Sequence, residues 1–85
     1  MGNITKAEFE FILQVLVAGL AEKIRVDLLV CEEEALEKLY ATELYAALKN
    51  EETKVWHYSV TMLYELYKVE IETGKLEIPD YFLYL

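Results

Sequence analysis

The 85-residue sequence predicts an all-α fold: a small irregular helical bundle with three longer helices, one short helix and an extended C-terminal arm. Apolar residues recur every three or four positions through most of the chain, which is the period of an α-helix. Recognisable capping residues stand where these periodic segments begin and end. No linker, repeat or low-complexity tract interrupts the chain, so we expect residues 1–85 to form a single helical domain.

The first helix is predicted to begin directly after Thr5. Thr5 and Glu8 can exchange two hydrogen bonds between side chain and backbone, which is the capping box that starts many helices. Ile4 can pack against Phe9 on the next turn and fix the direction in which the chain enters the helix. An apolar stripe then follows at helical spacing: Phe9, Ile12, Leu13, Leu16, Leu20 and Ile24.

A second apolar stripe lies on the opposite side of this helix. Phe11, Val15 and Ala18 follow the i, i+4, i+7 spacing of one helix face. Gly19 costs helix propensity, which indicates that another backbone approaches closely there. The following residues 25–30 are interpreted as the end of the helix and a short connector.

A second helix and a short third one are predicted between residues 32 and 48. Three consecutive carboxylates, Glu32, Glu33 and Glu34, favour a helix start because they complement the positive end of the helix dipole. The buried face of the second helix is predicted to consist of Ala35, Leu36, Leu39 and Tyr40. Continuing that face would bury Glu43, whereas Thr42 is a competent N-cap. We therefore expect a break at Thr42 and a separate short helix.

The last helix is predicted to follow a polar connector and to run from a Ser59 cap to Gly74, which can adopt the left-handed conformation that ends helices. Its core stripe is predicted to contain Val60, Leu63, Tyr64, Tyr67 and Ile71. A second stripe is predicted to contain Met62, Leu66 and Val69. The segment near Pro79 must be extended. The apolar terminus, Tyr81, Phe82, Leu83, Tyr84 and Leu85, is expected to dock on its own core or in a groove of a neighbouring subunit.

Composition limits the classes of partner. Sixteen acidic and eight basic residues give a net charge of −8, which repels a phosphate backbone, so we expect no nucleic-acid partner. The apolar run 11–21 is too short to cross a bilayer, and Glu8 and Glu10 stand where an export signal needs positive charge. We therefore expect no membrane partner. A lone cysteine, Cys31, suits a reducing compartment, so we expect a cytoplasmic protein.

No catalytic, cofactor or metal site is predicted. His57 and Cys31 are the only residues of their kinds, and His57 is interpreted as a partly buried ring between its aromatic neighbours. Glu33 and Glu37 lack the histidine partners of a di-iron bundle. The acidic residues of the last helix are interpreted as an exposed polar edge: Glu65, Glu70 and Glu72. We therefore expect neither an enzyme nor a bound cofactor.

Apolar content leads to the functional prediction. Hydrophobic residues make up 55% of a chain that is too short to bury them all. The second apolar stripes of the first and last helices should therefore contact another chain. We expect a non-enzymatic protein–protein interaction module, either self-associating as a homodimer or acting as a small regulatory or adaptor subunit. The predicted interface residues are Phe11, Val15, Ala18, Met62, Leu66, Val69, Tyr81, Phe82, Leu83 and Tyr84. The alternative is an acidic inhibitor or antitoxin-like protein that neutralises a basic partner.

Overall fold

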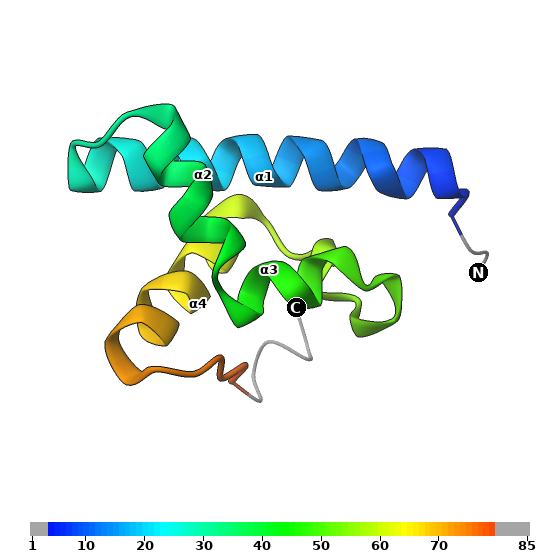
Figure 1. Cartoon of the computed structure of the whole chain (residues 1–85). Coiled ribbons are helices and arrows are strands. Elements are labelled where there is room, and N and C mark those ends of the chain that lie inside the picture. The colour runs from blue at the N-terminus through cyan, green and yellow to red at the C-terminus, as the bar shows by residue number, and fades with distance from the viewer. Residues whose placement is uncertain (1–3, 80–85) are drawn as a thin grey trace.

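The computed structural model describes residues 4–79, in which every regular element is helical. The elements are α1 (Lys6–Leu28), α2 (Glu32–Tyr40), α3 (Glu43–Lys49), the 3-10 turns η1 (Glu51–Thr53) and η2 (Val55–His57), and α4 (Val60–Thr73). The long α1 lies along one side of the molecule, α2 crosses its C-terminal part, and α3, the 3-10 turns and α4 lie beneath it (Figure 1). The predicted all-α bundle of three longer helices and one short helix is confirmed. The two 3-10 turns between α3 and α4 were not predicted.

Local capping signals set the helix boundaries. The Thr5 hydroxyl accepts a hydrogen bond from the Glu8 amide at 3.1 Å, and the Glu8 carboxylate accepts one from the Thr5 amide at 2.9 Å. The Ser59 side chain caps α4 by accepting from the Met62 amide, and Gly74 ends that helix in the left-handed conformation with φ 90°. These three predictions are confirmed.

The predicted break at Thr42 is also confirmed. The buried Thr42 hydroxyl donates to the Leu39 carbonyl at 2.6 Å and accepts from the Tyr45 amide at 3.1 Å. One side chain therefore satisfies a backbone group at the end of α2 and another at the start of α3. This is the reason that two short helices form here in place of one continuous helix.

Gly19 permits the close packing of α4 against α1. A Cβ atom at Gly19 would lie 2.9 Å from Cγ2 of Val60, the first residue of α4, which is closer than real Cβ contacts. The sequence predicted a close approach by another backbone, whereas the neighbour is a branched side chain. The glycine lets the start of α4 pack directly on the middle of α1.

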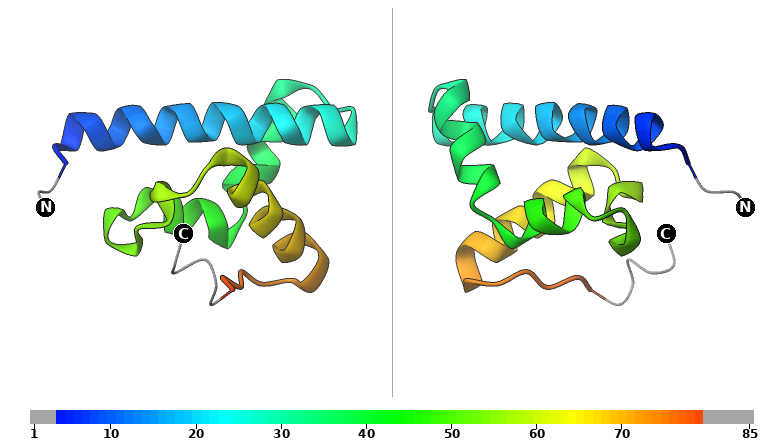
Figure 2. Two further views of the ribbon diagram at one scale, coloured as in Figure 1. Left: turned by 180° about the vertical axis from the view of Figure 1, so that it is seen from behind. Right: turned by 45° about the vertical axis from the view of Figure 1, so that its right-hand side comes forward.

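The core lies among the four helices. Figure 2 shows α3 and α4 on one side of α1 and α2 running from the C-terminal end of α1 across to α3. Its fully buried large side chains come from every helix and from η2: Leu20, Ile24, Leu39, Leu44, Leu48, Val55 and Leu63. The helical stripe predicted for α1 supplies Phe9, Leu16, Leu20 and Ile24 to this core.

The burial of α4 differs from the prediction. Leu66, which was assigned to a second face in need of outside cover, is only 2% exposed, and Met62 and Val69 are half-buried. Ile71, which was assigned to the core stripe, is 60% exposed. The reason is that α4 contacts α3 as well as α1, so the chain itself covers two sides of this helix. The prediction of an open second face on α4 is therefore wrong for Leu66.

Residues 4–79 include no helix with both the length and the hydrophobicity that crossing a bilayer requires.

Candidate functional site

The outer face of α1 is an exposed surface whose apolar residues the sequence predicted to need outside cover. Phe11 is 66% exposed and Val15 is 51% exposed, and Ala18 is exposed beside them. In Figure 1, α3 and α4 lie beneath α1, and α2 crosses the C-terminal part of α1. We define the outer face by these three residues and by the charged residues in line with them, Glu8 on one side and Glu22 and Arg25 on the other. A row of apolar side chains between charged ends is typical of helix–helix interfaces.

An ion pair organises the C-terminal part of the outer face. The Arg25 guanidinium donates to both carboxylate oxygens of Glu22, from Nε at 3.1 Å and from Nη2 at 2.7 Å. These hydrogen bonds lower the pKa of Glu22 and raise the pKa of Arg25, so both groups stay charged at neutral pH. Glu32 at the start of α2 adds a weaker favourable charge interaction with Arg25.

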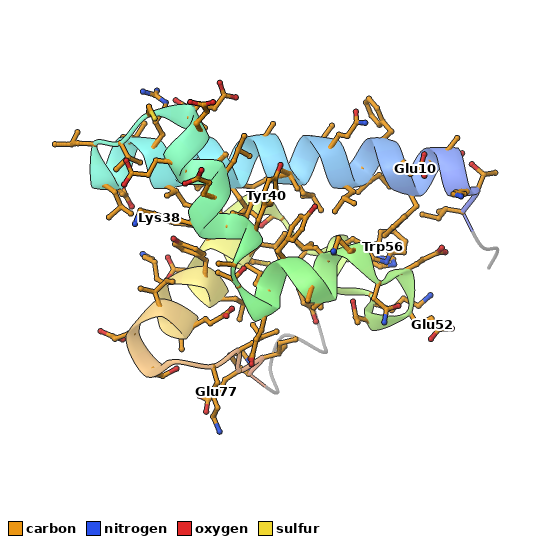
Figure 3. The ribbon with its side chains drawn as sticks, viewed as in Figure 1. Glu10, Lys38, Tyr40, Glu52, Trp56 and Glu77 are labelled. Carbon is orange, nitrogen blue, oxygen red and sulfur yellow. The ribbon has the colours of Figure 1, made fainter. Side chains whose placement is uncertain are left out.

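The N-terminal half of α1 is held in place by Trp56. The Trp56 ring meets the Phe9 ring edge to face, with centroids 5.6 Å apart, and its indole N–H donates to the Glu51 carbonyl at 2.8 Å. Figure 3 shows Trp56 on the side of the 3-10 turns that faces α1. The contact fixes the part of α1 that presents Phe11 and Val15 to solvent.

A groove lies between the C-terminal end of α1 and α4. The Tyr64 hydroxyl donates to the Asp27 carboxylate at 2.6 Å, and the Tyr64 and Tyr67 rings stack with centroids 5.7 Å apart. Asp27 and Tyr64 line two adjoining hollows, of about 370 and 300 Å³. The larger one is bordered by the exposed side chains of Leu28 and Ile71. The groove can accept an apolar side chain, and among residues 4–79 no group of three or more possible metal ligands lies there.

Tyr64 links this groove to the stability of the fold. Burial of its ring, together with the hydrogen bond to Asp27, raises the pKa of Tyr64 well above the ordinary 10.0. Burial also raises the pKa of Tyr67. Folding therefore favours the neutral form of both phenols. Their contribution to the free energy of unfolding is fully present below the unfolded-state pKa, near pH 10. It is lost as the pH rises from there through the folded-state pKa.

We expect Tyr64→Phe to reduce the pH dependence of stability in alkaline solution. The variant lacks the hydroxyl that must stay protonated in the folded state, so its free energy of unfolding should fall less steeply above pH 10 than that of the wild type. Loss of the hydrogen bond to the exposed Asp27 should cost about 1 kcal/mol at pH 7. Urea unfolding followed by circular dichroism from pH 7 to 11 measures both effects. Tyr40→Phe, at a half-exposed ring, is the matched control, and equal alkaline slopes for the wild type and Tyr64→Phe would contradict the expectation.

Glu70 is a structural residue that the sequence analysis placed wrongly. It was interpreted as part of an exposed edge, but it is 7% exposed and its carboxylate accepts from the Glu43 amide at 2.6 Å and from the Leu44 amide at 3.0 Å. Glu70 therefore caps the first turn of α3 from a distant helix. Its position four residues after Leu66 puts it on the buried side of α4, which is the signal that could have indicated this role.

The only cysteine and the only histidine lie at different ends of α1. Cys31 follows the C-terminal end of α1 and is exposed, whereas His57 stacks on Trp56, which contacts Phe9 near the N-terminal end. The helix rise makes Phe9 and Leu28 about 28 Å apart along the axis, so no thiol–imidazole pair can form. His57 is exposed and not partly buried as predicted. Within residues 4–79, no group of three or more histidine, cysteine or acidic side chains could hold a metal ion.

The predicted interface residues have three different outcomes. Those on α1, Phe11, Val15 and Ala18, are exposed, and their role in an interface stays a prediction. Those on α4, Met62, Leu66 and Val69, are half-buried or buried. Those in the terminal arm, Tyr81, Phe82, Leu83 and Tyr84, lie outside the described residues. Comparison of the chain with protein-family models, with curated proteins and with solved structures finds no match.

Proposed function

We propose that this protein is a non-enzymatic interaction module that self-associates through the outer face of α1. The observation that carries the proposal is the exposure of Phe11 (66%) and Val15 (51%) on one face of the longest helix. Water contact with such side chains is unfavourable, and association with another apolar surface removes it. A second copy of the chain is always present at the same concentration and brings an identical apolar face.

The form of the surface sets the expected strength. A face one helix wide lies at the small end of stable protein interfaces, so we expect a dissociation constant on the order of micromolar. Phe11 is the natural anchor because aromatic side chains contribute a large contact area at low cost in conformational entropy. The exposed, unpaired Cys31 favours a reducing compartment, and we propose a cytoplasmic location on that ground.

A second candidate function rests on charge. The first turn of α2 presents Glu32, Glu33 and Glu34 to solvent, and Glu37 follows on the next turn. A protein that neutralises a basic partner would use such a surface, and its binding would weaken strongly as salt rises. Association through the apolar outer face should change little with salt concentration. Measuring partner affinity at 50 and 500 mM salt therefore separates the two candidates.

The test of the proposed function is sedimentation equilibrium of the full chain over a range of concentrations. We expect the 9.9 kDa chain to sediment as a dimer above micromolar concentration. Val15→Glu puts a charge at the centre of the outer face and should raise the dissociation constant about a hundredfold. Circular dichroism checks that the variant keeps its helices.

Ile71→Glu is the matched control. Ile71 is as exposed as the outer-face residues, at 60%, but it lies on α4 beside the groove. We expect it to leave dimerisation unchanged. A wild type that stays monomeric at 100 μM, or a dimer that Ile71→Glu dissociates while Val15→Glu does not, would refute the proposed function.

A further inference from the structure

The spacing of the outer face extends beyond its apolar centre. Six residues of α1 recur at alternating intervals of three and four positions: Glu8, Phe11, Val15, Ala18, Glu22 and Arg25. This is the a and d spacing of a two-stranded coiled coil. Five of the six are exposed in the folded chain, and Arg25, at the end of the row, is half-buried.

The charges in this row decide between the two possible orientations of a helix pair. In a parallel pair each position faces itself, so Glu8 meets Glu8, Glu22 meets Glu22 and Arg25 meets Arg25. Three pairs of like charges would then lie inside or beside the interface, which is unfavourable. A parallel pair is therefore disfavoured by the charges of this sequence.

An antiparallel pair centred between residues 16 and 17 removes these repulsions. Val15 then faces the partner's Ala18, and Glu8 faces the partner's Arg25. Twofold symmetry forms each of these contacts twice. Phe11 lies against the partner's Glu22, whose carboxylate is already held by Arg25, and a guanidinium packs well on an aromatic ring.

We propose that two copies of this chain pair through antiparallel α1 helices in this register, with Glu8 of each copy bound to the partner's Arg25. The inference rests on the proposed self-association and specifies its geometry. Glu22 and the partner's Glu8 then share one guanidinium, which keeps the charges at the interface margin paired. The apolar centre supplies affinity, and the charged ends supply orientation.

Site-specific cross-linking tests the register. In a Cys31→Ser background, Phe11→Cys and Glu22→Cys proteins are mixed, oxidised mildly and separated by mass. The proposed register places residue 11 opposite the partner's residue 22, whereas two residues 11 lie about 16 Å apart along the axis, beyond the reach of a disulfide. We expect mixed disulfides to exceed same-variant disulfides about tenfold. Because both are compared in one mixture, this ratio does not depend on the dissociation constant of the dimer.

Charge exchange is the second measurement. Arg25→Glu should weaken dimerisation about tenfold, and adding Glu8→Arg should restore most of the loss, because opposite charges face one another again. Glu8→Arg also removes the acceptor of the Thr5 amide, so circular dichroism checks the helix content of both variants. Same-variant disulfides in excess, or no restoration by the double variant while its helices persist, would overturn the register. If either result were obtained while the wild-type protein still dimerises, the register would be wrong and the proposed function would stand. A wild type that stays monomeric removes both proposals.

Discussion

Replacing Glu70 by alanine should destabilise the fold more than any other change to a polar side chain described above. The variant leaves the amides of Glu43 and Leu44 without their acceptor at the buried junction of α3 and α4. Losing two hydrogen bonds to a charged group in that setting should cost about 3 kcal/mol. A domain of this size has a total stability of roughly 5–10 kcal/mol, so the loss is a large fraction. Urea unfolding followed at 222 nm measures it.

Two further variants show whether capping is the cause. Glu72→Ala removes an exposed carboxylate two residues further along α4 and should change stability by less than about 0.5 kcal/mol. Glu70→Gln keeps one acceptor oxygen and should fall between Glu70→Ala and the wild type. If Glu70→Ala and Glu72→Ala had equal effects, the assignment of Glu70 as the cap of α3 would be wrong.

Trp56→Ala is expected to have the largest effect on stability of any core substitution near the outer face. Removing a buried aromatic side chain typically costs about 3–5 kcal/mol. It also removes the Phe9 contact and the hydrogen bond to the Glu51 carbonyl, which together hold the N-terminal half of α1. Amide hydrogen exchange should therefore speed up first in residues 8–15, and dimerisation should weaken with it.

Trp56→Phe separates packing from hydrogen bonding. It keeps an aromatic ring against Phe9 and loses only the indole N–H, so we expect a cost of about 1–2 kcal/mol and a dimer of nearly normal affinity. Thermal unfolding and sedimentation of the same samples give both values. A Trp56→Ala protein whose residues 8–15 exchange as slowly as in the wild type would show that Trp56 does not support the outer face.

The parts of the fold that the sequence predicted are those that local interactions determine. The Thr5 capping box, the Thr42 break and the Gly74 terminus each depend on residues within a few positions of one another. The apolar repeat of α1 also identified correctly which of its faces would be buried. Such features need no knowledge of how the helices cross.

The parts that were missed depend on contacts between distant segments. Whether Leu66 and Glu70 are buried is decided by the path of α3 across α4, and periodicity within α4 cannot show that path. The hydrogen bond between Tyr64 and Asp27 joins residues 37 positions apart. The sequence therefore predicted an exposed row on α1 and gave no indication of the groove beside it.

These results relate the architecture to the proposed role. The helices α3 and α4 lie beneath α1, and α2 crosses its C-terminal part (Figure 1). The helix α1 is long enough to present the exposed side chains of Phe11, Val15 and Ala18 along one face. Trp56 packs on Phe9 near one end of this row, and the Glu22–Arg25 pair lies within the row near the other end. A rigid helix with one face open is suited to pairing with another helix.

The most direct test of self-association through the outer face is a dilution series followed by methyl and aromatic NMR. On dilution from 500 to 5 μM, we expect signals of Phe11, Val15 and Ala18 to shift together as part of the dimer dissociates, while the methyl signals of Ile71 stay constant. Spectra that do not change over this range would contradict the account, as would shifts confined to Ile71 and the groove.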